Sequence, residues 1–356
     1  MAVIARVTAL AAALALASAL PATGASGGAA AAQPERATAS WQGLDVWHFR
    51  YRDLPGGRSY PVAITFRGNE LAYPREGIAA IAATADAAIV QVHAYDQPSE
   101  LGRLVELPAT GEAGRRLDKH PLGTVVADPN GHVAFWTSRR PDGAHLVALD
   151  TTTGAKVVGP AVTGRQRVFA VEGSTAYVVQ GAWRPDPLVF TWSPGQAALT
   201  PLPAAFSHGG IVSDVSGDRV ASFDFDDGLY LTDRAGILLH TVPLFFGTFS
   251  PDAAYVVGFR GNGVAVYATE TAARVRFAGL HGRRASFARW SPGGILVLDT
   301  IPHGADPFGT DDVVITFACT PADATCRRLP GSVVSEGTPF LSSDAFGQFF
   351  DFLPSD

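Results

Sequence analysis

The feature that most constrains the fold of this chain is a short pattern that returns about every forty residues. Each copy has an apolar strand, a turn rich in Asp, Gly, Ser or Pro, and a second apolar strand, as in RWSPGGILVLD (289–299). The turn centres, which are spaced by 44, 43, 44, 35, 41 and 51 residues, are Asp86, Asn130, Gly173, Gly217, Asp252, Gly293 and Asp344. A period of this length without strongly amphipathic helical stretches predicts an all-β propeller of four-stranded antiparallel blades. A β-sandwich or a barrel of repeated hairpins is the alternative.

The two ends of the repeat array suggest how the ring closes. The last copy ends after two strands, and two further strands, GLDVWHFRY (43–51) and RSYPVAITF (58–66), precede the first full copy. A propeller has to close its ring without leaving an unpaired sheet edge. We therefore predict seven four-stranded blades, the seventh with inner strands from the C-terminus and outer strands from the N-terminus.

The N-terminal residues have the layout of a secretory signal peptide. Arg6 is the only charge in the first 34 residues, and it precedes an Ala/Leu run that Pro21 ends. This run is shorter than the roughly 20 apolar residues that span a bilayer. We expect residues 1–32 to be a cleaved signal peptide, 33–42 a flexible linker and 43–356 a single propeller domain of a secreted protein. A retained membrane anchor remains an alternative.

The charge balance limits the possible partners. Without residues 1–32 the chain has 26 Lys and Arg against 33 Asp and Glu, a net charge of about −7. Such a balance argues against nucleic-acid binding, which needs a basic stripe. No membrane span is expected in the mature chain.

Two cysteines, Cys319 and Cys326, flank a Pro/Ala/Asp/Ala turn in FACTPADATC (317–326). In an oxidising compartment two cysteines at this spacing predict a disulfide across a hairpin. A redox or metal role is the rival interpretation, but the Cys-x-x-Cys spacing and a second ligand pair are missing.

The turns RWSPGG (289–294) and TFSPDA (248–253), each before an apolar strand, and the motif RLPG after an outer strand resemble the repeats of TolB-like and WD-repeat-like propellers. The resemblance covers residues 43–354. No Trp-Asp dipeptide ends a blade, and only Gly131-His132 is similar to the Gly-His element of WD repeats. The resemblance implies a propeller fold without choosing among scaffolds, receptor partners and enzymes.

In a blade of this kind, the loops between the second and third strands and the connections between blades share one face of the ring. The blade connections include DKHPLG (118–123), FSHGG (206–210) and GLHGRR (279–284), whose histidines could surround the channel mouth. The other loops include TSRRPDGA (137–144), GAWRPDP (181–187) and a long loop at 300–312. The candidate ligand-binding residues are His120, Arg139, Arg140, Trp183, Arg184, His208, His281 and His303.

Searches for catalytic motifs find no Gly-x-Ser-x-Gly nucleophile elbow, Walker loop or dinucleotide fingerprint. We therefore predict no catalytic residues, no metal and no cofactor, and a monomeric scaffold that binds an extracellular or envelope protein or a glycan. Whether the chain is an enzyme stays open. One alternative is a metal-assisted lyase or lactonase that uses His120, His208 and His281. Another is a carbohydrate-binding module with Trp183 as its flat face.

Overall fold

The structure is a computed structural model. It describes residues 48–54, 58–66, 69–72, 76–94, 102–108, 114–162, 166–181, 187–224, 226–261, 263–304 and 314–334. The predicted signal peptide, the linker and the turn at Asp344 lie outside these residues.

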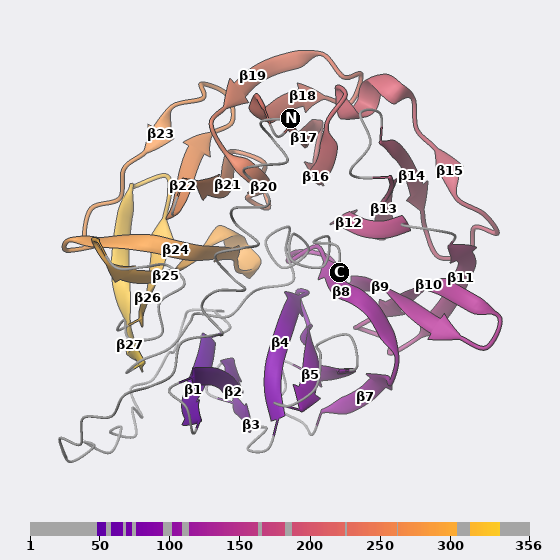
Figure 1. Cartoon of the computed structure of the whole chain (residues 1–356), viewed down its shortest axis with the longest axis horizontal. Helices are drawn as coiled ribbons and strands as arrows, with labels where there is room; N and C mark the ends of the chain where they lie inside the picture. Colours follow the sequence, from indigo (N-terminus) through magenta and orange to yellow (C-terminus); the bar gives the residue numbers. More distant parts are fainter. Residues whose placement is uncertain are drawn as a thin grey trace, which may run out of the picture.

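The described chain forms a ring of antiparallel sheets, each made of strands that are consecutive in sequence (Figure 1). Three of the six four-stranded sheets are β4–β7 (Glu76–Ala83, Ala87–Ala94, Arg103–Pro108, Arg115–Asp118), β8–β11 (Pro121–Ala127, Val133–Arg140, Gly143–Asp150, Lys156–Val162) and β12–β15 (Gln166–Glu172, Thr175–Gln180, Leu188–Trp192, Thr200–Pro201). The other three are β16–β19 (Ile211–Ser216, Arg219–Asp224, Gly228–Asp233, Leu238–Val242), β20–β23 (Phe245–Phe249, Tyr255–Arg260, Gly263–Ala268, Arg274–Val275) and β24–β27 (Arg283–Trp290, Leu296–Pro302, Val314–Thr320, Thr325–Val334). Two short 3₁₀ helices are η2 (Ala204–Ser207) and η3 (Pro292–Gly294).

The prediction of a β-propeller is confirmed, but the prediction of seven four-stranded blades is wrong, because the described part of the chain forms six. The strands β1 (His48–Leu54) and β2 (Arg58–Phe66) were expected to be the outer half of a shared blade. They instead form a three-stranded sheet with β3 (Asn69–Ala72), between β27 and β4 in the ring (Figure 1). The sequence of β3, NELA, has no β-branched or aromatic residue to mark it as a strand.

Six of the predicted turn centres lie where the repeat pattern requires, between the first and second strands of the six blades. Because neighbouring strands are antiparallel, the turn after the first strand and the turn after the third strand lie on one side of the ring, here called the turn face. The loop after the second strand and the connection to the next blade lie on the opposite side, here called the loop face.

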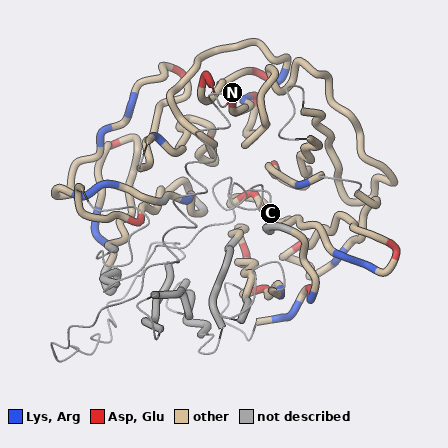
Figure 2. The backbone as a smooth tube through the Cα atoms, viewed as in Figure 1, with Lys and Arg blue, Asp and Glu red and all other residues tan. Residues whose placement is uncertain are grey.

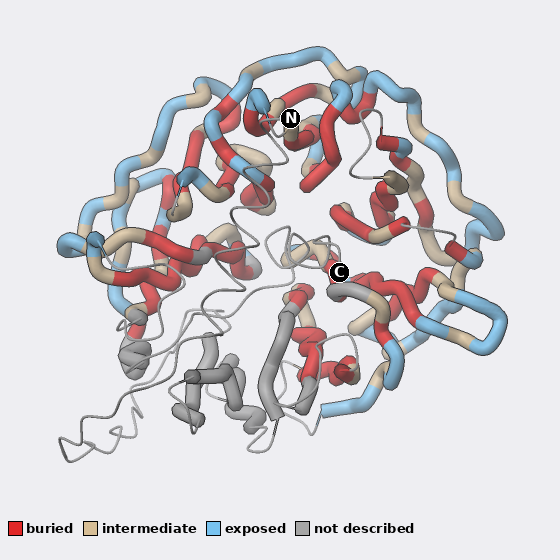
Figure 3. Tube along the Cα trace, viewed as in Figure 1, coloured by how far each residue is buried: buried red, intermediate tan, exposed pale blue. Residues whose placement is uncertain are grey.

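The hydrophobic core lies between neighbouring blades rather than within any one of them. Figure 3 shows buried residues on the inner strands and exposed residues along the outer strands. One cluster of buried side chains spans the three blades from β12 to β23. The rings of Phe135 and Trp192, which belong to neighbouring blades, meet edge to face at 5.7 Å between centroids. Each large apolar side chain buried in this way stabilises the fold by about 1.5–3 kcal/mol. The ring is therefore held together mainly by apolar contact between sheet faces.

The predicted disulfide is confirmed. Cys319 on β26 and Cys326 on β27 are directly opposite in the strand register, and their sulfur atoms are 2.04 Å apart. Cys319 is buried against the blade β20–β23, so the bridge fixes the outer hairpin of the last described blade. No helix among the described residues is long and apolar enough to cross a membrane.

Candidate functional site

On the turn face, acidic side chains join several neighbouring blades. The Asp128 carboxylate accepts a hydrogen bond of 3.0 Å from the backbone N–H of Gly173, and Glu172 accepts one of 2.7 Å from that of Gly217. The second oxygen of Glu172 pairs with the guanidinium of Arg234. These carboxylates have partners within the ring and serve to hold neighbouring turns together.

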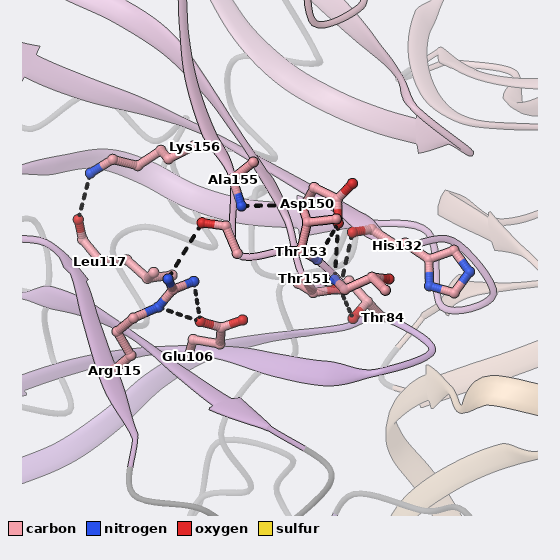
Figure 4. Close-up of polar contacts among 12 residues, drawn as sticks. Thr84, Glu106, Arg115, Leu117, His132, Asp150, Thr151, Thr153, Ala155 and Lys156 are labelled. Carbon is pink, nitrogen blue, oxygen red and sulfur yellow. Dashed lines mark hydrogen bonds and ion pairs between the residues drawn. The ribbon is translucent and has the colours of Figure 1, made fainter.

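Asp86 lies in the first turn of the blade β4–β7. One of its oxygens accepts a hydrogen bond of 2.6 Å from the Thr152 hydroxyl and lies 2.6 Å from Nδ1 of His132. The hydrogen bond from Thr152, followed by the contacts with His132, outweighs desolvation and lowers the pKa of Asp86. Thr84 and Thr151 extend this contact through their hydroxyl groups, 3.0 Å apart (Figure 4).

The outer strands of the same two blades are joined by basic side chains (Figure 4). Arg115 on β7 forms an ion pair of 2.6 Å with Glu106 and donates a hydrogen bond to the Gly154 carbonyl oxygen. Lys156 on β11 donates to the carbonyl oxygen of Leu117 at 3.1 Å. The polar groups in this interface are thus also engaged in joining blades.

A central cavity of about 190 Å³ opens among the ends of the inner strands β4, β8, β12, β16, β20 and β24. Its acidic residues include Asp128 and Glu172, which already bind backbone N–H groups. Across its mouth, the Asn130 side-chain oxygen accepts a hydrogen bond of 3.2 Å from the N–H of Gly293, which belongs to a distant blade. The polar groups named here link parts of the ring to one another.

A second hollow, of about 370 Å³, lies on the loop face, and most of its polar lining is basic. It lies between the end of β7 with its connection to β8 and the end of β9 with its turn into β10. The lining residues are Arg116, Leu117, Asp118, Lys119, His120, Ser138, Arg139, Arg140 and Pro141. Figure 2 shows Lys and Arg along β7 and near the tip of the β9–β10 hairpin. We call this feature the loop-face hollow.

Asp118 holds the two walls of the loop-face hollow together. Its carboxylate accepts hydrogen bonds from the Trp136 indole N–H at 2.7 Å and from the His120 backbone N–H at 2.9 Å. Burial would raise the pKa of Asp118, but hydrogen bonds from Ser138, the His120 backbone and Trp136 outweigh it and lower the pKa. The backbone N–H of Arg139 also donates to the His120 carbonyl oxygen at 2.9 Å.

The cations of the loop-face hollow lack acidic partners within the described part of the chain. No ion pair joins Arg116, Lys119, Arg139 or Arg140 to a described carboxylate. Arg116, Lys119 and Arg139 are exposed, and Arg140 is half-buried with a buried Nε that has no hydrogen-bond partner. Concentrated positive charge in a chain of net charge −6 creates a local field that attracts anions.

The structure brings His120, Arg139 and Arg140 together in this hollow. His208 lies elsewhere: its ring meets Tyr230 on β18 at 5.1 Å between centroids, and its Nδ1 is 3.1 Å from the Gly236 carbonyl oxygen. His208 is therefore placed beside the outer half of the blade β16–β19.

The remaining predicted residues do not join the hollow. His281 and His303 are exposed on adjacent segments, with the His303 N–H bonded to the Gly282 carbonyl oxygen at 3.1 Å. Trp183 and Arg184 lie outside the described residues. Across the described ranges, no three His, Cys, Asp or Glu side chains form a group that could hold a metal ion.

Arg116, Lys119 and Asp118 of the loop-face hollow were not among the sequence-predicted site residues. Arg115 and Arg116 are adjacent on β7, but alternation along the strand sends Arg115 to the neighbouring blade and leaves Arg116 in the hollow. The segment DKH (118–120) was considered only for its histidine. The high density of basic residues between residues 115 and 140 is the sequence feature that could have indicated this site.

No family model and no curated protein sequence matches the chain. Solved structures do match. The β-propeller domain of the Trilobed protease from Pyrococcus furiosus is 7% identical, with a TM-score of 0.51, over 79% of this chain and 93% of that one. The acylaminoacyl peptidase of Pyrococcus horikoshii is 8% identical, with a TM-score of 0.53, over 86% of this chain and 52% of that one.

TolB from Acinetobacter baumannii is also similar, at 16% identity and a TM-score of 0.43. The match covers 64% of this chain and 62% of the length of that TolB. Likenesses at these identities concern the fold alone. The chain is a β-propeller, as its sheet topology and its likeness to the Pyrococcus furiosus propeller show, and TolB structures are among the solved structures that it matches.

Proposed function

We propose that this chain is an extracytoplasmic β-propeller that acts as a monomeric, non-catalytic scaffold and binds its partner on the loop face. The observation that carries the proposal is the loop-face hollow, where Arg116, Lys119, Arg139 and Arg140 have no described acidic partner. On the turn face, by contrast, the carboxylates of Asp86, Asp128 and Glu172 hold neighbouring blades together. A rigid ring that leaves charged side chains unpaired on one face is suited to recognition.

Two further observations support a location outside the cytoplasm. The disulfide between Cys319 and Cys326 is typical of oxidising compartments. The first 32 residues have the composition of an export signal. Mass spectrometry of the protein from its native cells should find the mature N-terminus near residue 33 and the two cysteines oxidised.

Site-specific photocrosslinking tests which face binds. A photoreactive amino acid is placed at Pro141, which is exposed in the β9–β10 hairpin of the loop face, and in a matched variant at Asp218, which is exposed in the β16–β17 turn of the turn face. In intact cells, the variant at position 141 should give an adduct of defined mass and the variant at position 218 should not. Adducts from position 218 alone would contradict the proposal.

A further inference from the structure

We propose that the loop-face hollow binds an acidic segment of a partner protein, a stretch that presents several Asp or Glu carboxylates. This inference rests on the proposed function, because it names the partner chemistry for the same face. The inference is based on a cluster of cations that two separate segments, residues 116–120 and 139–140, bring into one hollow.

Charge is the first argument. Arg116, Lys119, Arg139 and Arg140 share one hollow, and Asp118, the acidic residue of its lining, already accepts hydrogen bonds from Trp136 and from the backbone. Like charges held close together repel one another, and a bound anion removes that repulsion. A ligand with several carboxylates spaced along an extended segment can meet several of these cations together.

Rigidity is the second argument. The hydrogen bond from the Arg139 N–H to the His120 carbonyl oxygen ties the two walls, and Trp136, which is fully buried, holds the Asp118 carboxylate. The backbone segments that carry the cations are therefore fixed relative to each other before a ligand arrives, which lowers the conformational entropy lost on binding.

The chemistry of arginine is the third argument. Part of the Arg140 guanidinium is buried, and its Nε has no hydrogen-bond partner, so the protein does not offset the desolvation of that nitrogen. A carboxylate at the exposed end of this guanidinium would form charge-assisted hydrogen bonds that offset it. Arginine matches planar carboxylates in particular.

The apolar lining favours a peptide over a sugar. Leu117 and Pro141 are the apolar residues of the hollow, and none of its described lining residues is aromatic. The described lining therefore offers sugar rings no flat aromatic face to pack on, whereas an extended peptide needs only charge complementarity and small apolar contacts.

The test uses the mature protein and a fluorescently labelled peptide of eight glutamates, with a peptide of eight glutamines as the neutral probe. Fluorescence anisotropy at 50 mM NaCl compares the wild-type protein with R139Q/R140Q. The matched control is R327Q/R328Q, which removes two neighbouring exposed arginines from β27, away from the hollow. Thermal melting first confirms that both variants are folded.

We expect the octaglutamate to bind at least fivefold more weakly to R139Q/R140Q and within twofold of wild type to R327Q/R328Q. Binding should weaken as NaCl rises to 200 mM, and the glutamine peptide should not bind. Equal losses in the two variants would show general attraction to surface charge and would overturn the inference.

Two further outcomes separate this inference from the proposed function. Tighter, hollow-dependent binding of a sulfated oligosaccharide than of octaglutamate would overturn the acidic-segment inference and would point to a glycan. Absence of octaglutamate binding while position 141 still gives a defined crosslink would also overturn it, and the proposed function would stand. Crosslinks from the turn face alone would instead contradict the proposed function.

Discussion

The ion pair between Arg289 and Asp299 offers a sharp test of how this propeller is held together. It joins the inner two strands of the blade β24–β27, with 2.8 Å between the guanidinium nitrogen and the carboxylate oxygen. The two side chains are only 9% and 3% exposed. The other carboxylate oxygen accepts a hydrogen bond of 2.7 Å from the Thr316 hydroxyl on β26. We predict that Asp299→Asn destabilises the fold strongly.

The magnitude follows from burial. Asparagine keeps the shape of aspartate, but when its oxygen accepts the Thr316 hydrogen bond its NH₂ group faces the Arg289 guanidinium. The negative charge and the hydrogen bond from Arg289 are then both lost. Removing one partner of a buried ion pair costs about 3–5 kcal/mol, because the other loses its counter-charge in a low dielectric. In a chain of this size each kcal/mol of lost stability lowers the melting temperature by roughly 2 °C, so we expect it to fall by about 6–10 °C.

The assay is thermal and urea denaturation at pH 7, followed by tryptophan fluorescence. The set comprises D299N, D299L, R289M, the double variant R289M/D299L, which is compared with its two single variants, and the control D218N. Asp218 pairs with Arg219 at 3.3 Å but is 77% exposed, so its loss should cost less than about 1 kcal/mol. The double variant should be more stable than the sum of the single effects predicts, by at least about 2 kcal/mol. A loss below about 1 kcal/mol in D299N, or additive single effects, would refute the reasoning.

Three other predictions concern stability. Replacing both Cys319 and Cys326 with Ala should lower the free energy of unfolding by about 2–3 kcal/mol in urea, because the bridge closes a loop of sequence separation 7; no change would contradict this. At Gly236 φ is +81° and a Cβ would lie 1.9 Å from a backbone oxygen, so Gly236→Ala should lower the free energy of unfolding by about 3 kcal/mol or more. The control Gly195→Ala, where a Cβ would meet open space, should lower it by about 1 kcal/mol. Equal losses would argue against close packing at Gly236. Hydrogen bonds lower the pKa of Asp118 below its usual 3.8, so the ionised side chain stabilises the fold above that pH and loses this effect as pH falls through the lower folded-state pKa. The difference in stability between wild type and D118N should therefore disappear in acid. A difference that does not change with pH would count against this reasoning.

The blade-forming hairpins were predictable because the chemistry of each one is local. Turns such as those at Gly173 and Gly217 have φ values of +56° and +59°, which glycine adopts without strain, and each lies between two apolar strands. The hairpin with Cys319 and Cys326 was predictable for the same reason. The strand β3 was missed because Asn69–Ala72 has no β-branched or aromatic residue. The sequence therefore did not show that the N-terminal sheet has three strands.

The candidate site was less predictable because it depends on contacts between segments. His120 and Arg139 were expected on one face, but only the packing of the β7–β8 connection against β9 places them in one hollow with Arg116. His208 lies in an analogous connection, yet η2 packs against a neighbouring blade and brings this histidine to Tyr230. Equivalent positions in a repeat therefore do not have equivalent surroundings.

The amino-acid sequence determined the repeating hairpins, the disulfide and the propeller class, because each depends on neighbouring residues or on a constant period along the chain. Among the described residues, the tertiary structure decided that six blades have four strands and which basic side chains in the loop-face hollow lack an acidic partner. A strand pairs with the sheet edge nearest to it, and a basic side chain pairs with the acidic group nearest to it. Both depend on the packing of segments that are far apart in the sequence.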